Sequence, residues 1–437
     1  MPGKNGGGVS IAGASLGERV RTARKALGMS QAQLAGEELT KGFISQLESG
    51  TVRPSIRSLQ IIAGRLGKPL DHFLGDEVLS SEKRVIFHRL AAETAVEQRN
   101  WAAVREHCAL GLESPVDGAE RASFLLLLGR ASQADRDFER TFELVNEALG
   151  LIKIDASAQL AAELLTLRGH AYFQLNQLAA ATEAYETARD VMEKYEVPEP
   201  RLRSRLLIAL GSAYRRLKRT SKAITAYESA LAHASRTSQL VLAAQGYMGM
   251  AASHYDSGEL DAAIANYRRA RELFERLSDI DFELSCFQSI ATVQFENGDI
   301  AAAKTSAERA MERAIGVGNA RWAAVVEVLL SRIALQEGRA EEALRLAKHG
   351  EKMLSETDDK IQRADALGAT GAALEALGRT VDADKAYQAS LDLYTKIDDL
   401  ADRSGMAAEY ARVLKSRGQI DEAFDMLELA RGGVTRR

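Results

Sequence analysis

A short stretch near the N-terminus, TKGFISQLESG, carries small polar side chains at helical spacing. At about 100° per residue, one arc of a helix here is polar and the opposite arc is apolar. Short polar side chains with one cation suit close approach to the edges of base pairs in the major groove of DNA. The same arc also fits an ordinary solvated helix face. The polar arc consists of Lys41, Gly42, Ser45, Gln46 and Ser49.

The local sequence predicts three helices that position this arc. The first runs from Leu16 and ends at Gly28, because glycine favours the left-handed conformation that follows a helix. Ser30 is expected to cap the second helix and Thr40 the third, since their hydroxyls accept hydrogen bonds from the first backbone amides of a helix. A compact helical unit therefore presents the arc.

The segments SQAQLA, FISQLESG, TVRPS, IRSLQIIAGRLG and LDHFLG, in this order, resemble the Xre family of helix-turn-helix domains, to which phage Cro and repressor proteins belong. The resemblance covers residues 16–75 and implies a domain of five helices that binds double-stranded DNA. It implies base-reading positions at Lys41, Gly42 and Gln46, with Ser45 beside them, and phosphate-binding positions at Gln31 and Arg53. It also implies a buried ion pair between Arg24 and Glu48. Gly42 departs from the pattern because it has no side chain with which to read a base.

The remaining chain repeats at a regular step of roughly 40 residues, within the range typical of helical repeat proteins. Each of five glycines is followed five residues later by an alanine, and in earlier units a tyrosine such as Tyr227 lies four residues after the alanine. This pattern resembles the tetratricopeptide repeat, whose paired helices stack into a right-handed superhelix. The glycines are Gly258, Gly298, Gly338, Gly378 and Gly418. An all-α chain is predicted throughout.

These patterns divide the chain into four parts. We expect a disordered tail over residues 1–14, a helix-turn-helix domain over 15–76, a linker over 77–84, and a repeat domain of seven to nine helical pairs over 85–437. No proline follows residue 200, so nothing there removes a backbone donor from a helix. The segment 1–76 carries 10 Lys and Arg against 6 Asp and Glu, and the rest of the chain carries 47 against 55. A basic head on an acidic body fits DNA at one end.

The composition favours an intracellular binding protein. The two cysteines, Cys108 and Cys286, each sit in an apolar helical pattern, which predicts buried free thiols and a cytoplasmic location. No apolar run is long enough for a membrane span, and the N-terminus lacks the apolar core of a signal peptide. No grouping of His, Cys, Ser or Asp has the spacing of a metal or catalytic site, so we expect no cofactor and no enzymatic activity.

The first helix of each repeat pair is expected to line a concave groove. Mixed polar and aromatic residues there fit a peptide-binding surface, although a solvated face has a similar composition. The residues expected to face inward are Arg215, Gln245, Met248, Tyr255, Gln288, Thr292, Phe295 and Arg332.

An Xre-like head followed by a long repeat body resembles the cytoplasmic peptide-pheromone receptors of Gram-positive bacteria. This resemblance implies a homodimeric transcription regulator that binds an operator and senses a peptide or another ligand through its repeats. The Ala-rich C-terminal repeats, which lack a polar capping helix, are expected to form the dimer contact. Two alternatives stay open. In one the repeats dock a protein partner, and in the other the protein is a repeat adaptor without regulatory DNA binding.

Overall fold

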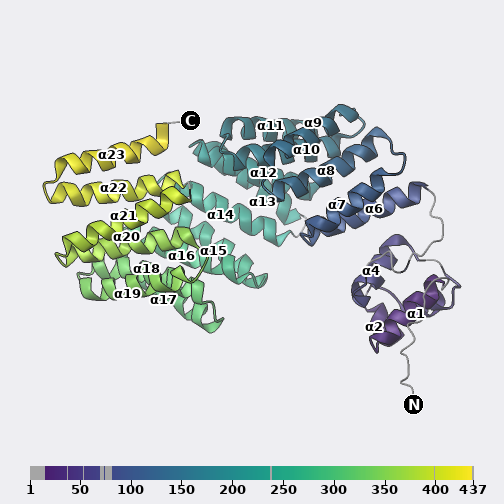
Figure 1. The fold of residues 1–437 in the computed structure, drawn as a ribbon, viewed down its shortest axis with the longest axis horizontal. Helices are drawn as coiled ribbons and strands as arrows, with labels where there is room; N and C mark the ends of the chain where they lie inside the picture. The colour runs from purple at the N-terminus through teal and green to yellow at the C-terminus, as the bar shows by residue number, and fades with distance from the viewer. Residues whose placement is uncertain are drawn as a thin grey trace, which may run out of the picture. The chain divides into compact units, whose positions relative to one another are not determined.

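The computed structural model describes residues 15–36, 38–52, 54–68, 73, 81–236, 239–397 and 399–435. These residues form 22 α-helices, and none of them lies in a β-strand, so the all-α prediction is confirmed. Two compact units are distinguished, one ending at Leu175 and the other beginning at Asn176. Figure 1 shows the helices of each unit. None of the helices in the described ranges is long and apolar enough to cross a membrane.

The N-terminal domain packs four described helices around a small apolar core. Ser15 and Ser30 cap the first two helices, and Thr40 accepts a hydrogen bond from the amide of Phe43, so the caps predicted at Ser30 and Thr40 are confirmed. Leu34, Ile44 and other apolar side chains are completely buried at the centre. Most of the fifth helix expected here falls on residues outside the described ones. Phe73, which is described, is helical and buried. The helices are α1 (Leu16–Ala26), α2 (Gln31–Ala35), α3 (Lys41–Glu48) and α4 (Ile56–Leu66).

Eighteen helices follow in the described part of the chain. Those of the first unit are α6 (Ser81–Glu97), α7 (Trp101–Leu112), α8 (Gly118–Ala134), α9 (Phe138–Leu151) and α10 (Ala158–Gln174). Those of the second unit are α11 (Leu178–Lys194), α12 (Pro200–Arg216), α13 (Thr220–Arg236), α14 (Leu240–Asp256), α15 (Leu260–Arg276), α16 (Ile280–Glu296), α17 (Ile300–Gly316), α18 (Ala320–Gln336), α19 (Ala340–Ser355), α20 (Lys360–Ala376), α21 (Thr380–Lys396), α22 (Leu400–Ser416) and α23 (Ile420–Thr435).

The regular period of the repeats has the structural cause that the sequence predicted. All five turn glycines adopt φ between 71° and 80°, a left-handed conformation that favours glycine. The alanine five residues later is buried in every case, as at Ala263 and Ala303, because two helices approach closely there. Tight turns and small contact residues therefore recur at the same step.

Tyrosine fills the space between neighbouring pairs. Tyr227 on α13 is 1 % exposed and lies against Gly211 of α12 and Gly249 of α14, where a Cβ atom at either glycine would collide with the ring. Tyr387 occupies the equivalent place against Gly371. The large side chain and its small partners thus match in shape, as expected for a closely packed interior.

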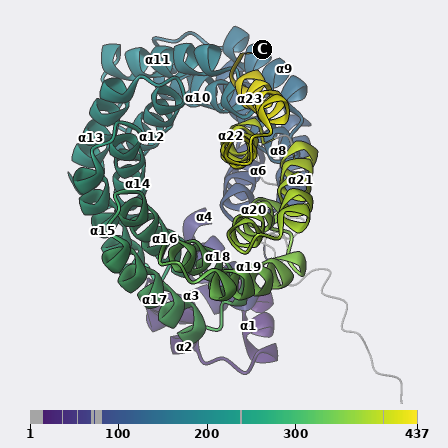
Figure 2. The ribbon, with the colours of Figure 1, turned by 90° about the vertical axis from the view of Figure 1, so that its left-hand side faces the viewer.

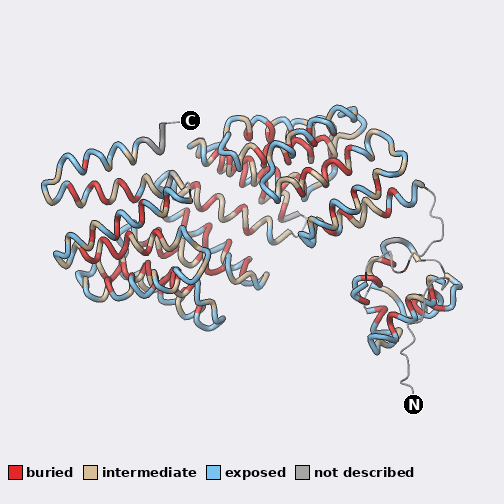
Figure 3. Tube along the Cα trace, viewed as in Figure 1, coloured by how far each residue is buried: buried red, intermediate tan, exposed pale blue. Residues whose placement is uncertain are grey.

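The second unit is a curved double row of helices. Figure 2 shows the first helices of the pairs, such as α12, α14 and α16, on the inner side and their partners α13, α15 and α17 on the outer side. Burial is concentrated along the contact between the two rows, and both rows also expose residues to solvent (Figure 3). The inner and the outer side are therefore the two surfaces on which this unit can bind another molecule.

Candidate nucleic-acid interface and ligand surfaces

The polar arc of α3 lies on the surface of the N-terminal domain. Lys41, Gly42, Ser45, Gln46 and Ser49 are all exposed. On the opposite side of the helix, Ile44 and Leu47 are buried in the core and Phe43 packs partly against it. Packing of the apolar arc therefore fixes which side chains α3 offers to a partner.

Two charged residues lock α3 against the first helix. Arg24 of α1 donates from Nε to Oε1 of Glu48 over 2.5 Å and from Nη2 to Oε2 over 2.8 Å. Their side chains are only 10 % and 4 % exposed. Such a two-point contact holds a guanidinium and a carboxylate in one geometry. The ion pair implied by the family resemblance thus lies at the C-terminal end of α3.

Gln31 completes this cluster, since its side-chain amide donates to Oε2 of Glu48 over 2.9 Å. Burial by itself raises the pKa of Glu48, but the hydrogen bonds from Arg24 and Gln31 outweigh it and hold that pKa below its usual value. The carboxylate therefore stays charged at neutral pH. The family resemblance implies a phosphate-binding role for Gln31, and the structure adds this internal contact.

The contacts of Arg65 in the helix-turn-helix domain were not predicted from the sequence. Arg65 of α4 donates from Nη1 to the carbonyl oxygens of Leu34 and Ala35, which end α2, and pairs with Glu38. A Cβ atom on Gly36, which has φ of 53°, would collide with this guanidinium. A cation at the carboxyl end of a helix is favourable because the carbonyl oxygens there lack partners. Arg65 thus sets the turn between α2 and α3.

The remaining predicted contact, Arg53, lies outside the described residues. Just before it, the hydroxyl of Ser49 donates to the carbonyl oxygen of Gln46 over 3.0 Å and lies 2.7 Å from that of Thr51. These bonds hold the end of α3 and the start of the following loop together.

All eight residues expected in the repeat groove lie on the first helices α12, α14, α16 and α18, and all are partly exposed. Several also hold neighbouring repeats together. Arg215 pairs with Asp256 over 3.0 Å, Tyr255 donates to Glu296, and Arg332 approaches Asp365 at 3.4 Å. Met248 and Phe295 pack against buried clusters. Gln245, Gln288 and Thr292 are the members for which the described structure shows no such link between repeats.

A cavity of about 290 Å³ near the C-terminus was missed by the sequence reasoning. Glu375 of α20, Tyr387 of α21 and Arg412 of α22 are among the residues that line it. The repeat period could have predicted this lining. Arg412 lies two periods after Arg332, and Glu375 lies two periods after Phe295, and both earlier residues were expected on the inner surface. The inner surface therefore continues into the last repeats.

Asp365, which approaches Arg332, is close enough to Asp402 to affect its charge. Burial, with Asp399 and Asp365 nearby, raises the pKa of Asp402 to about 6. Because the folded protein holds this proton more tightly than the unfolded chain, stability should fall as the pH rises from the usual carboxyl range towards 6. We expect Asp402→Asn to raise the melting temperature at pH 7, with a difference that closes at pH 4 in thermal melts.

A matched variant should behave in the opposite way. A hydrogen bond from Arg379 lowers the pKa of Asp382, so this carboxylate stabilises the fold at neutral pH and that contribution is lost on acidification. Asp382→Asn should therefore lower the melting temperature at pH 7. Equal shifts for both variants would contradict the assignment of the raised pKa to Asp402.

The last helix exposes an apolar stripe. Ile420, Phe424 and Leu427 of α23 are 59 %, 60 % and 46 % exposed, at the spacing of one helix face. The Ala-rich helices α20 and α22 bury their alanines instead, as at Ala366 and Ala407. The apolar surface expected at the end of the repeats thus comes from α23 and not from the Ala-rich helices.

Comparison with known families agrees with both parts of this architecture. A helix-turn-helix family model matches residues 20–73, and a tetratricopeptide-repeat model matches residues 160–236 and 242–316. The immunity repressor protein of Bacillus phage phi105 is 28 % identical over 75 residues, which are 17 % of this chain and 52 % of the repressor. The match to this curated relative thus spans about half of its length.

Two solved structures share the repeat fold. The apo form of RapI has a TM-score of 0.63 at 14 % identity and covers 80 % of this chain and 97 % of its own. The apo form of the quorum sensor NprR from B. thuringiensis has a TM-score of 0.59 at 13 % identity and covers 81 % of this chain and 98 % of its own. At such low identity the likeness concerns the fold alone. The family matches therefore identify a helix-turn-helix domain over residues 20–73 and tetratricopeptide repeats over residues 160–236 and 242–316 of this chain.

Proposed function

We propose that the protein is a homodimeric transcription regulator that reads an operator with α3 and is controlled by a ligand on its repeats, without catalysing a reaction. The observation that carries this proposal is the exposed arc of α3 together with the buried Arg24–Glu48 pair, which joins α3 to α1. Base reading requires side chains held in one register on the groove, and the pair supplies that rigidity. Lys41, Ser45, Gln46 and Ser49 then face the bases, and Gly42 allows close approach.

The inner surface of the repeats is the proposed ligand site. It combines partly exposed aromatic and amide side chains, such as Phe295, Gln245 and Gln288, with arginine–carboxylate pairs that link successive repeats. A peptide laid along it would compete for these pairs and change how the repeats stack. The resemblance of the chain to peptide-pheromone receptors favours a short peptide as the ligand, and the similar fold of the quorum sensor NprR fits a sensing role.

The proposal is tested in two steps. Fluorescence anisotropy with DNA from upstream of the protein's own coding region should show binding that is tighter than to random DNA and weakens with salt. Native mass spectrometry of protein purified from its source should show a copurified small ligand. If the protein binds neither DNA at moderate salt, it is not a DNA-binding regulator, and the repeat adaptor is favoured. If a protein copurifies instead of a small ligand, the repeats dock a protein partner.

Gln46→Ala tests the reading arc. We expect operator binding to weaken by ~1–3 kcal/mol and binding to random DNA to stay nearly unchanged, because the lost hydrogen bonds are specific to one base. Anisotropy titrations on the two DNAs measure the difference. An equal loss on both would remove Gln46 from the base-reading positions.

Arg53→Ala is the reciprocal test, based on the role that the family resemblance implies for this residue. Affinity should fall on every DNA, and the slope of log affinity against log salt should become shallower by about one, because one phosphate contact is lost. Titrations over a range of salt concentrations give this slope. A slope identical to that of the unmodified protein would exclude the phosphate contact.

A further inference from the structure

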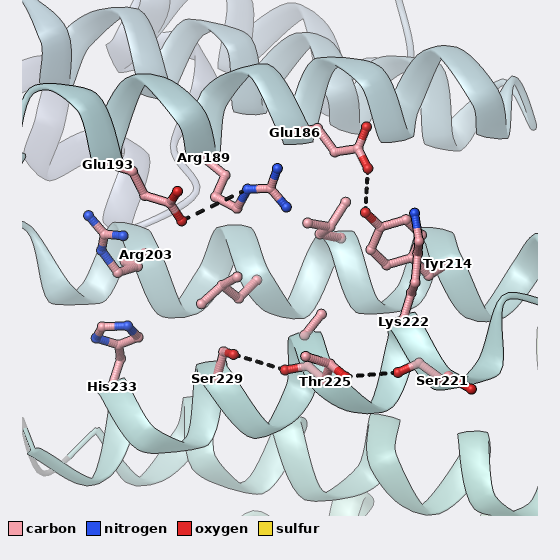
Figure 4. Close-up of a pocket in the computed structure, with 13 residues that line it drawn as sticks. Glu186, Arg189, Glu193, Arg203, Tyr214, Ser221, Lys222, Thr225, Ser229 and His233 are labelled. Carbon is pink, nitrogen blue, oxygen red and sulfur yellow. Dashed lines mark hydrogen bonds and ion pairs between the residues drawn. The ribbon is translucent and has the colours of Figure 1, made fainter.

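The repeat changes register once within the second unit. In the described chain, α11 begins at Leu178 and α12 at Pro200, which is two residues beyond the regular step that later places the helix starts at Thr220, Leu240 and Leu260. The two additional residues lie in the turn before Pro200, where Glu196 adopts φ of 48°. A groove of about 670 Å³ opens at this place between the outer helices α11 and α13, with α12 beneath it (Figure 4).

The groove has an apolar floor and one wall of hydroxyl groups. Leu207 and Leu210 of α12 form the floor, and both side chains are almost completely buried. Ser221, Thr225 and Ser229 follow one another along the wall on α13 (Figure 4). The hydroxyls of Thr225 and Ser229 donate to the carbonyl oxygens four residues earlier, over 3.0 and 2.9 Å. Their protons are thus used, and their oxygen lone pairs remain as acceptors.

The charges of the opposite wall are largely neutralised within the protein. Glu186 of α11 accepts a hydrogen bond from Tyr214, and Arg189 pairs with Asp190 and Glu193. Two other cations have no such carboxylate partner within the described chain. Arg203 donates to the carbonyl oxygen of Met192, and Lys222 lies 5.4 Å from the centre of the Tyr214 ring. Arg203 and Lys222 are therefore the cations of the groove that are available to an acidic partner.

These two cations stand at opposite ends of the groove (Figure 4). Tyr214, which lies beside Lys222, is eleven positions after Arg203 on the same helix, which corresponds to about 16 Å at roughly 1.5 Å per residue. An extended chain of about five residues covers this length. The hydroxyl wall has a matching period, because residues four apart on a helix recur every ~6 Å and amides on one edge of an extended chain recur every ~6.6 Å.

We propose that this outer groove binds an extended segment of a partner protein, about five residues long, with an acidic side chain near each end. The backbone amides of the segment donate to Ser221, Thr225 and Ser229, its apolar side chains rest on Leu207 and Leu210, and its carboxylates meet Arg203 and Lys222. The site shares no residue with the inner surface or with α3, so the proposal does not depend on whether a ligand binds to the inner surface.

The same positions two repeats later explain why the groove occurs here. Residue 203 corresponds to Glu283 and residue 233 to Arg313, and these two side chains pair over 2.9 Å across the equivalent space. Lys222 corresponds to Ala302. The repeat around α12 thus combines both cations with the longer turn, whereas the repeat two periods later has neither cation.

The test uses the full chain with ¹³C-labelled leucine methyl groups and a capped pentapeptide, acetyl-Asp-Val-Ala-Leu-Asp-amide. Titration should shift the methyl resonances of Leu207 and Leu210 saturably. The peptide with Asn in place of both Asp should bind roughly fivefold more weakly, since two partly exposed ion pairs are lost. Arg203→Gln with Lys222→Gln should abolish that preference while the leucine spectrum stays folded.

Thr225→Val removes one acceptor at nearly constant shape and should weaken the peptide roughly fivefold. Its control is Thr305→Val, because Thr305 lies two periods later, is exposed, and donates to Ala301 over 3.0 Å in the same way. This control should bind like the unmodified protein. Three results overturn the proposal: unshifted Leu207 and Leu210 methyls at millimolar peptide, equal binding of the Asn peptide, or shifts confined to leucines of the inner surface.

Discussion

A Phe424→Glu, Leu427→Glu double variant is expected to be monomeric and to bind the operator about 10²–10⁴-fold more weakly than the unmodified protein. Both side chains belong to the exposed apolar stripe of α23, which the proposed dimer buries against a second copy. The two α3 helices of a dimer bind two half-sites of the operator at the same time. A monomer binds only one half-site and loses the affinity that the second contact adds. Light scattering gives the mass, and anisotropy gives the affinity.

The control replaces equally exposed apolar residues elsewhere. Ile315 at the end of α17 and Val381 on α21 are 66 % and 67 % exposed, so Ile315→Glu with Val381→Glu adds the same charge away from the stripe. This control should remain a dimer with full affinity. If the α23 variant also remains a dimer that binds tightly, the contact lies in the N-terminal domain or in earlier repeats.

The second large effect is expected for Glu48→Ala, which should destabilise the N-terminal domain by on the order of 3–5 kcal/mol. Removing the carboxylate leaves the guanidinium of Arg24 buried without a counter-charge and takes the acceptor from Gln31. Both tryptophans, Trp101 and Trp322, lie outside this domain, so their fluorescence does not report on it. Amide hydrogen exchange of α1 to α4 in the full chain measures the change.

Two further variants separate a buried pair from a surface pair. Arg24→Met together with Glu48→Leu should cost much less than Glu48→Ala, because no charge is left unpaired. Glu38→Ala removes a carboxylate whose side chain is 60 % exposed, and it should cost about 1 kcal/mol or less. Equal exchange rates in Glu48→Ala and in the unmodified protein would mean that the pair does not stabilise the domain.

This effect should also depend on pH. Because the pKa of Glu48 is held below its usual 4.5, its contribution to stability is present above that value and is lost as the pH falls through the lowered pKa. The difference between Glu48→Ala and the unmodified protein should therefore shrink in acid.

Local signals in the sequence were sufficient for the elements. Ser30 and Thr40 cap helices by accepting hydrogen bonds from residues three positions later. Gly258 and Gly298 lie in turns and adopt the left-handed backbone conformation that favours glycine. Such interactions join near neighbours, so they are visible without knowledge of the fold. The regular period extended this information over the repeats, since each unit packs against the next in the same way.

The sequence also carried a signal whose meaning only the structure showed. The step from Ala181 to Ala223 is two residues longer than the later steps, such as that from Ala223 to Ala263. The two additional residues are readable, but the groove beside them depends on the stacking of α11 and α13 and on which side chains reach across. Likewise, the polar arc of α3 was readable, whereas the contact between Gln31 and Glu48 required the packing of α2 on α3.

The sequence by itself therefore determined the helices, their caps, the repeat and the side of α3 that stays polar, because each depends on spacing along one helix or on a repeated contact. The tertiary structure decided which charged groups meet. Arg215 of α12 pairs with Asp256 of α14, and Arg417 lies between Glu375 and Asp384 of two other helices. Such partners are set by the angle and register at which whole helices stack, and these follow from the summed packing of many apolar residues.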